Sequence, residues 1–454
     1  MAARFPGVPP VSASAGICEQ PLETLLADLD ESAADLARAA VGWILPQGAA
    51  LAQLSQAELQ EFLWRQLPLN WMAETSELHE IAWSLADLFT LAGFGRYASI
   101  CRAPCTHELL DSWQDDDHAP ARRTMNEAVR SSGVDPPDTP LLGWGSVLGE
   151  VERTARRRVS QTLEQALDAG TLVPGQRGWK QLAARITEVT LLMPRLELRG
   201  GTLLQAVWRE RCVSWAAGQP ALRQALLAQI LPLLAGEVAI PGQARDCLTP
   251  LCWLLGQVGD GVTLTQAGWL PTAVVVEAND RFGWFDLVGF TVGTEMDLPE
   301  LATMNDLARR TRLVTRRGRR LSLSATGRRA LGDPGLLWRI VVAGTFSAGT
   351  YEGEGAALAA ATLVRASHPL ARSMVEAKVG GGLEGRWRTV SGESLDQWSA
   401  QDATHEFGLL AGVFGWVQQG GDGQNRTWQL TPVGRQAALL GLQLQARSPG
   451  KGVV

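Results

Sequence analysis

The amino-acid sequence predicts a mainly α-helical protein with small β-hairpins, in which a helical N-terminal half precedes two similar domains in tandem. Apolar residues recur at three-to-four-residue steps through much of the first 240 residues, the spacing typical of amphipathic helices. The motif L-[ST]-x-x-G-R-x-A occurs twice in the C-terminal half, at 323–330 and at 430–437. Each copy follows an apolar helix-like segment and a short hairpin. The repeat therefore predicts two units of one fold.

Composition places the chain among soluble globular proteins. It has 454 residues, 46% of them hydrophobic and 19% charged, enough for about three domains of ~150 residues with substantial cores. No apolar run reaches the ~18 residues expected of a membrane span, and residues 1–17 look disordered and lack the apolar core of a secretory signal. Six cysteines in so long a chain do not suggest a disulfide framework. These features predict a cytoplasmic protein without membrane association.

Charge is distributed unevenly along the chain. The formal net charge is −6, but residues 1–150 hold 8 basic and 21 acidic residues, a net charge of −13. From Arg309 to Arg329 there are nine arginines and no acid. The acidic half is either a solvated helical surface or a surface for a protein partner, for self-association or for masking the basic segment.

Four regions are predicted along the chain. Helical spacing defines an acidic domain over 18–140, whose stretch from Asp115 to Pro140 reads as a linker or long loop because it contains consecutive acids and a Pro-Pro pair. A second helical region covers 146–240, with helices over 147–169, 179–192 and 219–234 and a possible Thr202 cap. The two repeated domains follow over 247–345 and 355–446.

The first repeated domain has a predicted order of elements. Helices are expected over 251–258 and 268–279 on either side of a short strand at 262–265. The third helix is expected to begin with Asp297 as its cap, Pro299 in its first turn and Glu300 in a capping-box position. Its apolar face would carry Leu301, Met304 and Ala308, with Asn305, Arg309 and Arg312 facing away. Strands at 313–316 and 319–323 would close a hairpin around Arg317 and Gly318.

The second repeated domain is predicted to follow the same plan. Helices are expected over 356–367 and 370–377, with the Gly380-Gly381-Gly382 run breaking the chain, and a third helix over 403–414. Strands at 416–419 and 426–430 flank a polar, glycine-rich tip. Thr431 is placed to cap the last helix, with Pro432 at its first position.

This order of helix, short strand, two helices and two-stranded hairpin, closed by L-[ST]-x-x-G-R, resembles a winged-helix domain. The segment GVTLTQAGWLP at 261–271, followed later by 316–329, is also similar to uncharacterised actinobacterial proteins related to a plasmid-encoded open-reading-frame family. That family has no activity to transfer. The winged-helix resemblance covers the C-terminal part of the chain and implies two tandem winged-helix domains. That fold reads DNA, dimerises or binds proteins.

Arginines concentrate where a winged helix contacts DNA, since its third helix enters the major groove and its wing touches the flanking backbone. A guanidinium contacts phosphates and guanine edges bidentately, and phosphate neutralisation makes binding salt-dependent. The alternative to nucleic-acid binding is a charged hairpin that is merely solvated, or one that docks on the acidic N-terminal half. The candidate nucleic-acid-binding residues are Asn305, Arg309, Arg310, Arg312, Arg316, Arg317, Arg319, Arg320, Arg328 and Arg329. In the second domain the hairpin has only Arg426 and the third helix has no Arg or Lys, so duplex binding there is not expected.

Other patterns predict structure rather than chemistry. The basic cluster Arg156-Arg157-Arg158 is read as a solvated helical turn, and the 17 tryptophans as core residues, with Trp428 the one whose exposure matters. The C-x3-C-x-H spacing of Cys101, Cys105 and His107, with His118 beyond, is not a standard zinc pattern and favours helix-packed thiols. No nucleotide-binding, zinc-protease or serine-hydrolase motif is found, so neither an enzyme nor a cofactor is expected.

The leading hypothesis is a DNA-binding protein that contacts duplex through the helix and wing of the first repeated domain, in a regulatory, genome-maintenance or defence role. The alternative is a scaffold subunit of a larger complex, whose winged helices serve assembly. A DNA-binding protein needs the hairpin arginines exposed and the third helix open. A scaffold would bury that helix against other domains.

Overall fold

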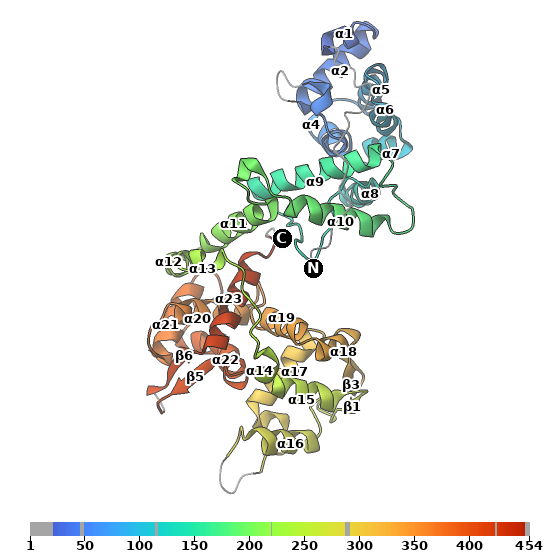
Figure 1. Ribbon diagram of the computed structural model, residues 1–454. Coiled ribbons are helices and arrows are strands. Elements are labelled where there is room, and N and C mark those ends of the chain that lie inside the picture. The colour runs from blue at the N-terminus through green and yellow to red at the C-terminus, as the bar shows by residue number, and fades with distance from the viewer. Residues whose placement is uncertain are drawn as a thin grey trace, which may run out of the picture. The chain divides into compact units, whose positions relative to one another are not determined.

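The computed structural model describes residues 21–45, 50–113, 117–218, 220–286, 291–422 and 425–449. The expectations for residues 1–17, and for the acids at 115 and 116, lie outside these ranges. The chain divides into two compact units, one of residues 1–144 and 150–206 and one of residues 145–149 and 207–454. Both are mainly helical, and two small three-stranded antiparallel sheets lie in the second (Figure 1). No helix within the described ranges is long and apolar enough to cross a membrane.

The first unit is a set of packed helices. Its core is centred on α5, whose Leu78, Ile81, Leu85 and Phe89 are fully or almost fully buried, as their helical spacing predicts. The last helix, α11, continues across the boundary into the second unit. The elements are α1 (Leu22–Leu26), α2 (Glu31–Ile44), η1 (Leu51–Gln53), α3 (Gln56–Glu61), the π-helix η2 (Phe62–Gln66), α4 (Leu67–Asn70), α5 (Thr75–Leu91), α6 (Gly95–Cys101), α7 (Pro104–Ser112), α8 (Ala119–Ser131), α9 (Glu150–Asp168), α10 (Trp179–Leu192), η3 (Leu196–Leu198) and α11 (Leu203–Ala216).

The loop predicted from Asp115 to Pro140 contains a helix instead. Helix α8 begins with Pro120 in its first turn, where proline lacks no needed donor, and it buries Ala121. Ala121, Met125, Ala128 and Val129 do recur at helical spacing and face the core of the first unit. The prediction gave more weight to the acids before this stretch and to the Pro-Pro pair after it. The Pro-Pro pair lies after the helix has ended.

The second unit contains two successive groups of elements with the same order. We define the first repeat as residues 249–332 and the second repeat as residues 351–446. Their sheets have the equivalent orders β1-β3-β2 and β4-β6-β5. The elements are α12 (Ala221–Ala228), α13 (Leu231–Leu234), α14 (Ala244–Cys247), α15 (Thr249–Val258), β1 (Val262–Thr263), α16 (Thr272–Phe282), η4 (Glu295–Asp297), α17 (Pro299–Arg310), β2 (Val314–Arg317), β3 (Arg320–Leu323), α18 (Ala325–Gly332), α19 (Pro334–Thr345), α20 (Tyr351–Val364), β4 (Leu370–Ala371), α21 (Arg372–Leu383), α22 (Gln397–Val413), β5 (Val417–Gly420), β6 (Thr427–Leu430) and α23 (Pro432–Ala446).

The repeated motif has the same structural role in both repeats. The hydroxyl of Ser324 accepts a hydrogen bond from the backbone N–H of Gly327, and Thr431 accepts one from Gly434 (2.8 and 3.0 Å). Each hydroxyl therefore caps the helix that follows the hairpin, as predicted for Thr431. Each hydroxyl also donates to the carbonyl of the residue two positions before the first strand of the hairpin, which is Arg312 in the first repeat and Gly415 in the second.

The glycine of the motif allows two backbone segments to touch. A Cβ atom on Gly327 would overlap the carbonyl oxygen of Leu313, and one on Gly434 would overlap that of Trp416. These carbonyls accept the backbone N–H of Ser324 and Thr431 (3.0 Å each). The motif thus packs the last helix of each repeat against the residue that directly precedes the first strand of its hairpin.

The glycine run at 380–382 does not break the chain as predicted, because α21 continues through it to Leu383. A Cβ on Gly381 would lie 2.8 Å from Leu222 in α12, and one on Gly382 would lie 2.8 Å from Leu358 in α20. The glycines let α21 approach both helices closely. Tertiary packing here outweighs the poor helix propensity of glycine.

The two repeats share one hydrophobic core. Trp338, Trp416 and Trp428 are buried, as predicted for the tryptophans, and the first two rings contact each other at 5.6 Å between centroids. The prediction is wrong for Trp43, Trp83 and Trp398, which are exposed. A single cluster of buried apolar residues runs from the end of α11 to α23. The repeats pack through α17 against α22, and α19, which connects the two repeats, packs against α23.

Helix α17 begins at Pro299, but Asp297 does not cap it. The Asp297 carboxylate accepts hydrogen bonds from the backbone N–H groups of Gly293 and Thr294 (2.9 and 2.8 Å), which closes the short η4 turn before the helix. These bonds hold the pKa of Asp297 below its usual value. The residue at the cap position is Leu298, and no side chain caps the helix.

Candidate nucleic-acid interface

The hairpin of β2 and β3, which we call the arginine hairpin (residues 314–323), has two chemically different faces. Val314, Leu321 and Leu323 are buried in the core of the repeat. Gly318 occupies the first of the two turn positions with φ +58, a backbone conformation that favours glycine. The alternation predicted for the second strand is confirmed. Because successive side chains alternate, the opposite face carries Thr315, Arg317, Arg320 and Ser322.

On this outer face two positive charges stand directly opposite each other. Arg317 pairs with Arg320 across the hairpin, and Arg320 also lies opposite Thr263 of β1. Like charges in such a pair destabilise a sheet. None of the arginines of the hairpin forms an ion pair with a carboxylate in the part of the chain that the structure describes. The face therefore combines guanidinium groups with hydroxyl groups and lacks a counter-charge.

Backbone carbonyls hold several of the guanidinium groups in place. Arg319 donates from Nε and Nη2 to the carbonyl of Leu264 (2.9 and 2.7 Å), and Arg320 donates from Nη2 to that of Asp260 (2.9 Å). Arg316 donates from Nε to the carbonyl of Gly318 (2.8 Å). A carbonyl carries no net charge, so these bonds orient each cation without neutralising it. Each guanidinium also retains further N–H donors.

Two glycines that sequence reasoning overlooked make room for this cluster. Arg309, at the end of α17, donates to the carbonyl of Gly268 (3.2 Å), and a Cβ on Gly268 would lie 3.0 Å from Nη1 of Arg316. A Cβ on Gly261 would overlap the guanidinium of Arg320. Both glycines have positive φ, +86 for Gly268 and +140 for Gly261. The sequence shows that both glycines lie in the segment 261–271, but not why glycine is needed there. The reason is the contact with Arg316 and Arg320, some fifty residues further along the chain.

Asn305 does not lie where the sequence analysis expected. It is 2% exposed, and its Nδ2 donates to Oε1 of Glu295 (2.6 Å), whose other oxygen accepts the backbone N–H of Leu270 (2.8 Å). The residue lies four positions after Leu301, so helical geometry places both on the buried face. Its polarity suggested an outward position, but inside the protein Glu295 accepts a hydrogen bond from the amide nitrogen of Asn305, while Oδ1 has no hydrogen-bond partner among the described residues. In this structure Asn305 is not accessible to a ligand.

Helix α17 is covered by the second repeat. Arg310 is paired with Asp306 on its own helix (3.0 Å) and, through both terminal nitrogens, with Glu406 of α22. Only Pro299, Asp306 and Arg310 on this helix are exposed by more than about a third of their surface. The third helix of the first repeat, α17, is therefore not accessible in the way that insertion into a DNA major groove requires.

The Arg310–Glu406 pair is expected to couple the two repeats energetically. Both side chains are partly buried, so a double-mutant cycle of Arg310→Ala and Glu406→Ala should give a coupling energy of about 1–2 kcal/mol. Urea unfolding of the second unit measures it. The exposed pair Arg38–Glu23 lies in the first unit and is the control; its double-mutant cycle, measured on the unfolding of that unit, should give a smaller coupling energy. Additive effects at Arg310 and Glu406 would contradict the expectation.

Three further candidates lie near the hairpin. Arg312 is exposed and has a positive φ of +56, which costs an L-residue energy, whereas the equivalent residue of the second repeat is Gly415 with φ +63. Arg328 and Arg329 are exposed on α18. None of the three arginines has an ion-pair partner within the described ranges.

The other arginine-rich segment and the second repeat have different surroundings. In the cluster 156–158, Arg156 pairs with Asp135 (2.7 Å) and Arg157 with Glu58 (3.3 Å), so two of the three charges are neutralised. In the second repeat Trp428 is 2% exposed and lies under the guanidinium of Arg372. The indole is therefore not available for base stacking.

The cysteine and histidine group is part of the first unit's packing. Cys101 is fully buried, and burial raises the pKa of its thiol to about 12. His107 stacks on His79 with 4.7 Å between ring centroids. In the described ranges no three such side chains converge in a way that could hold a metal ion.

In the described ranges eight of the ten sequence-predicted residues are thus cations without a carboxylate partner, whereas Asn305 is buried against Glu295 and Arg310 is paired with Asp306 and Glu406. Thr263, Thr315 and Ser322 join them from the sheet. Comparisons of the chain with protein-family models, with curated proteins and with solved structures found no match.

Proposed function

We propose that the two repeats are tandem winged-helix domains and that the protein binds duplex DNA through the wing of the first. The observation that carries this proposal is the uncompensated charge of the arginine hairpin. Guanidinium and hydroxyl groups are the usual side-chain donors to phosphate oxygens. Here Arg317 and Arg320 share the outer face of a three-stranded sheet with hydroxyl side chains, and carbonyl hydrogen bonds orient Arg319 and Arg320 before any ligand binds.

The proposed mode of binding is contact with the sugar–phosphate backbone. The third helix of the first repeat is packed on α22, so it is not free to enter a major groove without separation of the repeats. Phosphate contacts position a protein on DNA without reading its sequence. We therefore expect similar affinity for duplexes of different sequence and a steep dependence on salt.

The strained backbone of Arg312 is a second argument for a DNA-binding surface at the arginine hairpin. A strained residue persists when the surrounding structure compensates for it, and such residues cluster at functional sites. The first repeat keeps an arginine where the second has glycine, next to the hairpin that carries the unpaired cations. A solvated hairpin with no ligand gives no reason for this difference.

Fluorescence anisotropy with labelled duplex DNA over a salt series tests the proposal. The test variant replaces Arg316, Arg317, Arg319 and Arg320 by alanine, and the control replaces the exposed residues Arg122, Arg123, Arg130 and Arg185, so that both lose four positive charges. The first variant should lose binding, with a salt slope lower by up to about 3.6, and the control should bind as the wild type does. Absence of binding by the wild type at low salt, or equal loss in both variants, would overturn it.

A second candidate function is assembly of a larger complex. It is favoured by the packing of α17 on α22, since burial of the third helix is what a winged-helix scaffold requires. The acidic first unit is then the proposed docking surface for a protein partner or a second copy. Sedimentation at low salt, without DNA, distinguishes this function because it predicts a stable oligomer or a captured partner while the hairpin variant stays fully assembled.

A further inference from the structure

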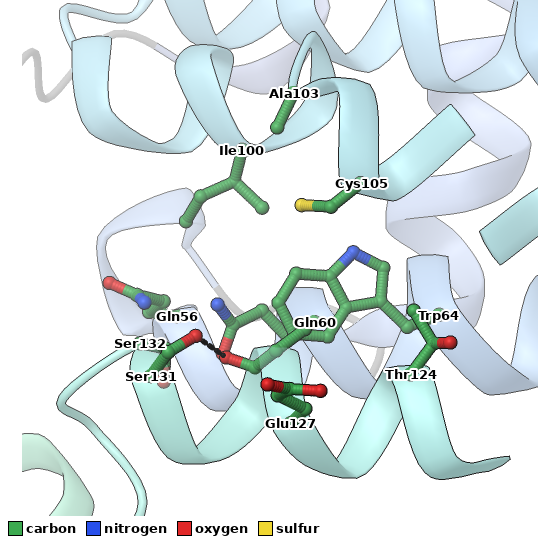
Figure 2. Close-up of a pocket in the computed structure, with 11 residues that line it drawn as sticks. Gln56, Gln60, Trp64, Ile100, Ala103, Cys105, Thr124, Glu127, Ser131 and Ser132 are labelled. Atoms are coloured by element: carbon green, nitrogen blue, oxygen red, sulfur yellow. Dashed lines mark hydrogen bonds between the residues drawn. The ribbon is translucent and has the colours of Figure 1, made fainter. Parts of the chain in front are cut away.

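The first unit contains a cavity of about 410 Å³ that the nucleic-acid proposal does not use. It lies between α3 with η2, the turn from α6 to α7, and α8 (Figure 2). Figure 2 shows Ile100 and Cys105 on one side of the space, Gln60 on the other, and the Trp64 ring beside them. Its volume is in the range of small-molecule sites.

Two buried carboxamides line the cavity. Gln56 and Gln60 are one helical turn apart and only 4% and 3% exposed, and Oε1 of Gln56 has no hydrogen-bond partner. The backbone of Gln56 is held from the opposite side, where its N–H donates to both carboxylate oxygens of Glu164 (3.1 and 3.0 Å). A buried acceptor without a partner is unfavourable, so a bound donor that reaches Oε1 would be stabilised.

The apolar part of the cavity suits a flat ring. The indole of Trp64 is fixed by a hydrogen bond from Nε1 to Oγ1 of Thr106 (2.9 Å), so it cannot turn away. Ile100 and Cys105 complete this side. An aromatic surface held in place is a stacking platform for heterocycles, and each carboxamide offers adjacent donor and acceptor atoms that match the edge of a nucleobase.

The charges of the lining side chains restrict which ligands the cavity can bind. Of the eleven side chains around the cavity, only Glu127 is charged, and none is Lys, Arg or His. Thr124, Glu127 and Ser131 are exposed on one face of α8 at the rim and add two hydroxyls and a carboxylate. A phosphate would meet no cation here and one anion.

We propose that this cavity binds an uncharged or cationic planar heterocycle of nucleobase or nucleoside size, and that it excludes the corresponding phosphorylated nucleotide. Gln56 and Gln60 hold the polar edge of the ring, and Trp64 packs against the ring. The inference does not depend on DNA binding by the second unit.

Protection of Cys105 from alkylation tests the proposal on the full chain. The half-buried thiol lines the cavity, so its rate of modification by N-ethylmaleimide, followed by peptide mass spectrometry, reports occupancy. Adenosine, cytidine and nicotinamide at millimolar concentration serve as probes, with adenosine monophosphate as the anionic comparison. At least one neutral probe should slow labelling of Cys105 severalfold. Labelling of Cys247 and Cys252, which lie outside the cavity, should be unchanged.

Matched variants separate recognition from folding. Gln60→Leu and Gln56→Leu should abolish protection without lowering thermal stability, because leucine removes a buried amide and keeps the volume. Gln53→Leu, at an exposed position outside the cavity, should bind as the wild type does. Equilibrium dialysis with labelled nucleoside gives the second, direct measurement. Equal protection by the monophosphate, retained binding in both Gln→Leu variants, or no binding of any probe in dialysis would overturn the proposal.

Discussion

Replacing Gly434 by alanine is expected to destabilise the second unit by more than about 3 kcal/mol. The added methyl would overlap the carbonyl oxygen of Trp416, which is backbone and cannot swing aside as a flexible side chain can. Relieving the overlap would pull α23 away from β5 and break the hydrogen bond from Thr431 N–H to that carbonyl. Gly327→Ala should have an effect of the same sign in the first repeat, through Leu313.

Urea unfolding followed by circular dichroism measures this effect, with separate transitions fitted for the two units. Gly332→Ala is the matched control, since a Cβ at that position of α18 meets nothing within 4 Å. The control should lie between unchanged and about 1 kcal/mol more stable. Wild-type stability of Gly434→Ala would show that the repeated motif does not hold the helix on the hairpin.

Reversing the charge of Arg317 is expected to change stability and binding in opposite directions. Arg317→Glu replaces the like-charged pair with Arg320 by an opposite-charged pair, which should stabilise the second unit by about 0.4–2 kcal/mol at low salt. The same change should weaken DNA binding by more than about tenfold, because a phosphate contact is lost and a repulsion is added. The neutral variant Arg317→Gln should fall between the two proteins in both measurements.

Salt distinguishes this expectation from a general effect of the substitution. The gain in stability should shrink between 0.05 and 0.5 M salt, since the pair is exposed and screened over about 10 Å at 0.1 M. Thermal unfolding gives the stability and anisotropy gives the affinity. A variant that is less stable than the wild type at low salt would mean that Arg317 has a structural partner, and the proposed phosphate surface would lose its main support.

Local chemistry explains where sequence reasoning succeeded. Residues Trp179–Leu192 form a helix with the predicted bounds, and Thr202 and Thr431 cap the helices that follow them. These features depend on periodicity and on hydroxyl groups next to their own helices, so all the necessary information is a few residues apart. The alternating faces of the arginine hairpin were predictable for the same reason.

Contacts between distant segments explain the errors. The run Gly380–Gly382 predicts the end of a helix, because the sequence does not show that Leu222 and Leu358 pack closely against these glycines. Asn305 reads as an outward polar residue until Glu295 is placed beside it. For the glycine run the local preference was judged correctly, but neighbours far along the chain outweighed it. For Asn305 the local pattern itself was misjudged, because a residue one helical turn after Leu301 lies on the same buried face.

Local patterns were enough to predict the order of elements in the first repeat, the Thr431 cap and the run of arginines on the hairpin, because periodicity, capping and charge are local properties. They did not reveal the short strand β4, which lies in a stretch predicted as helix and forms by pairing with β6. Three features could be seen only in the folded protein: α22 covers α17, the carbonyls at 260, 264 and 268 accept hydrogen bonds from guanidinium groups, and Gln56 and Gln60 line a cavity. Those features depend on which surfaces meet when the helices pack, and packing joins residues whose separation along the chain carries no periodic signal.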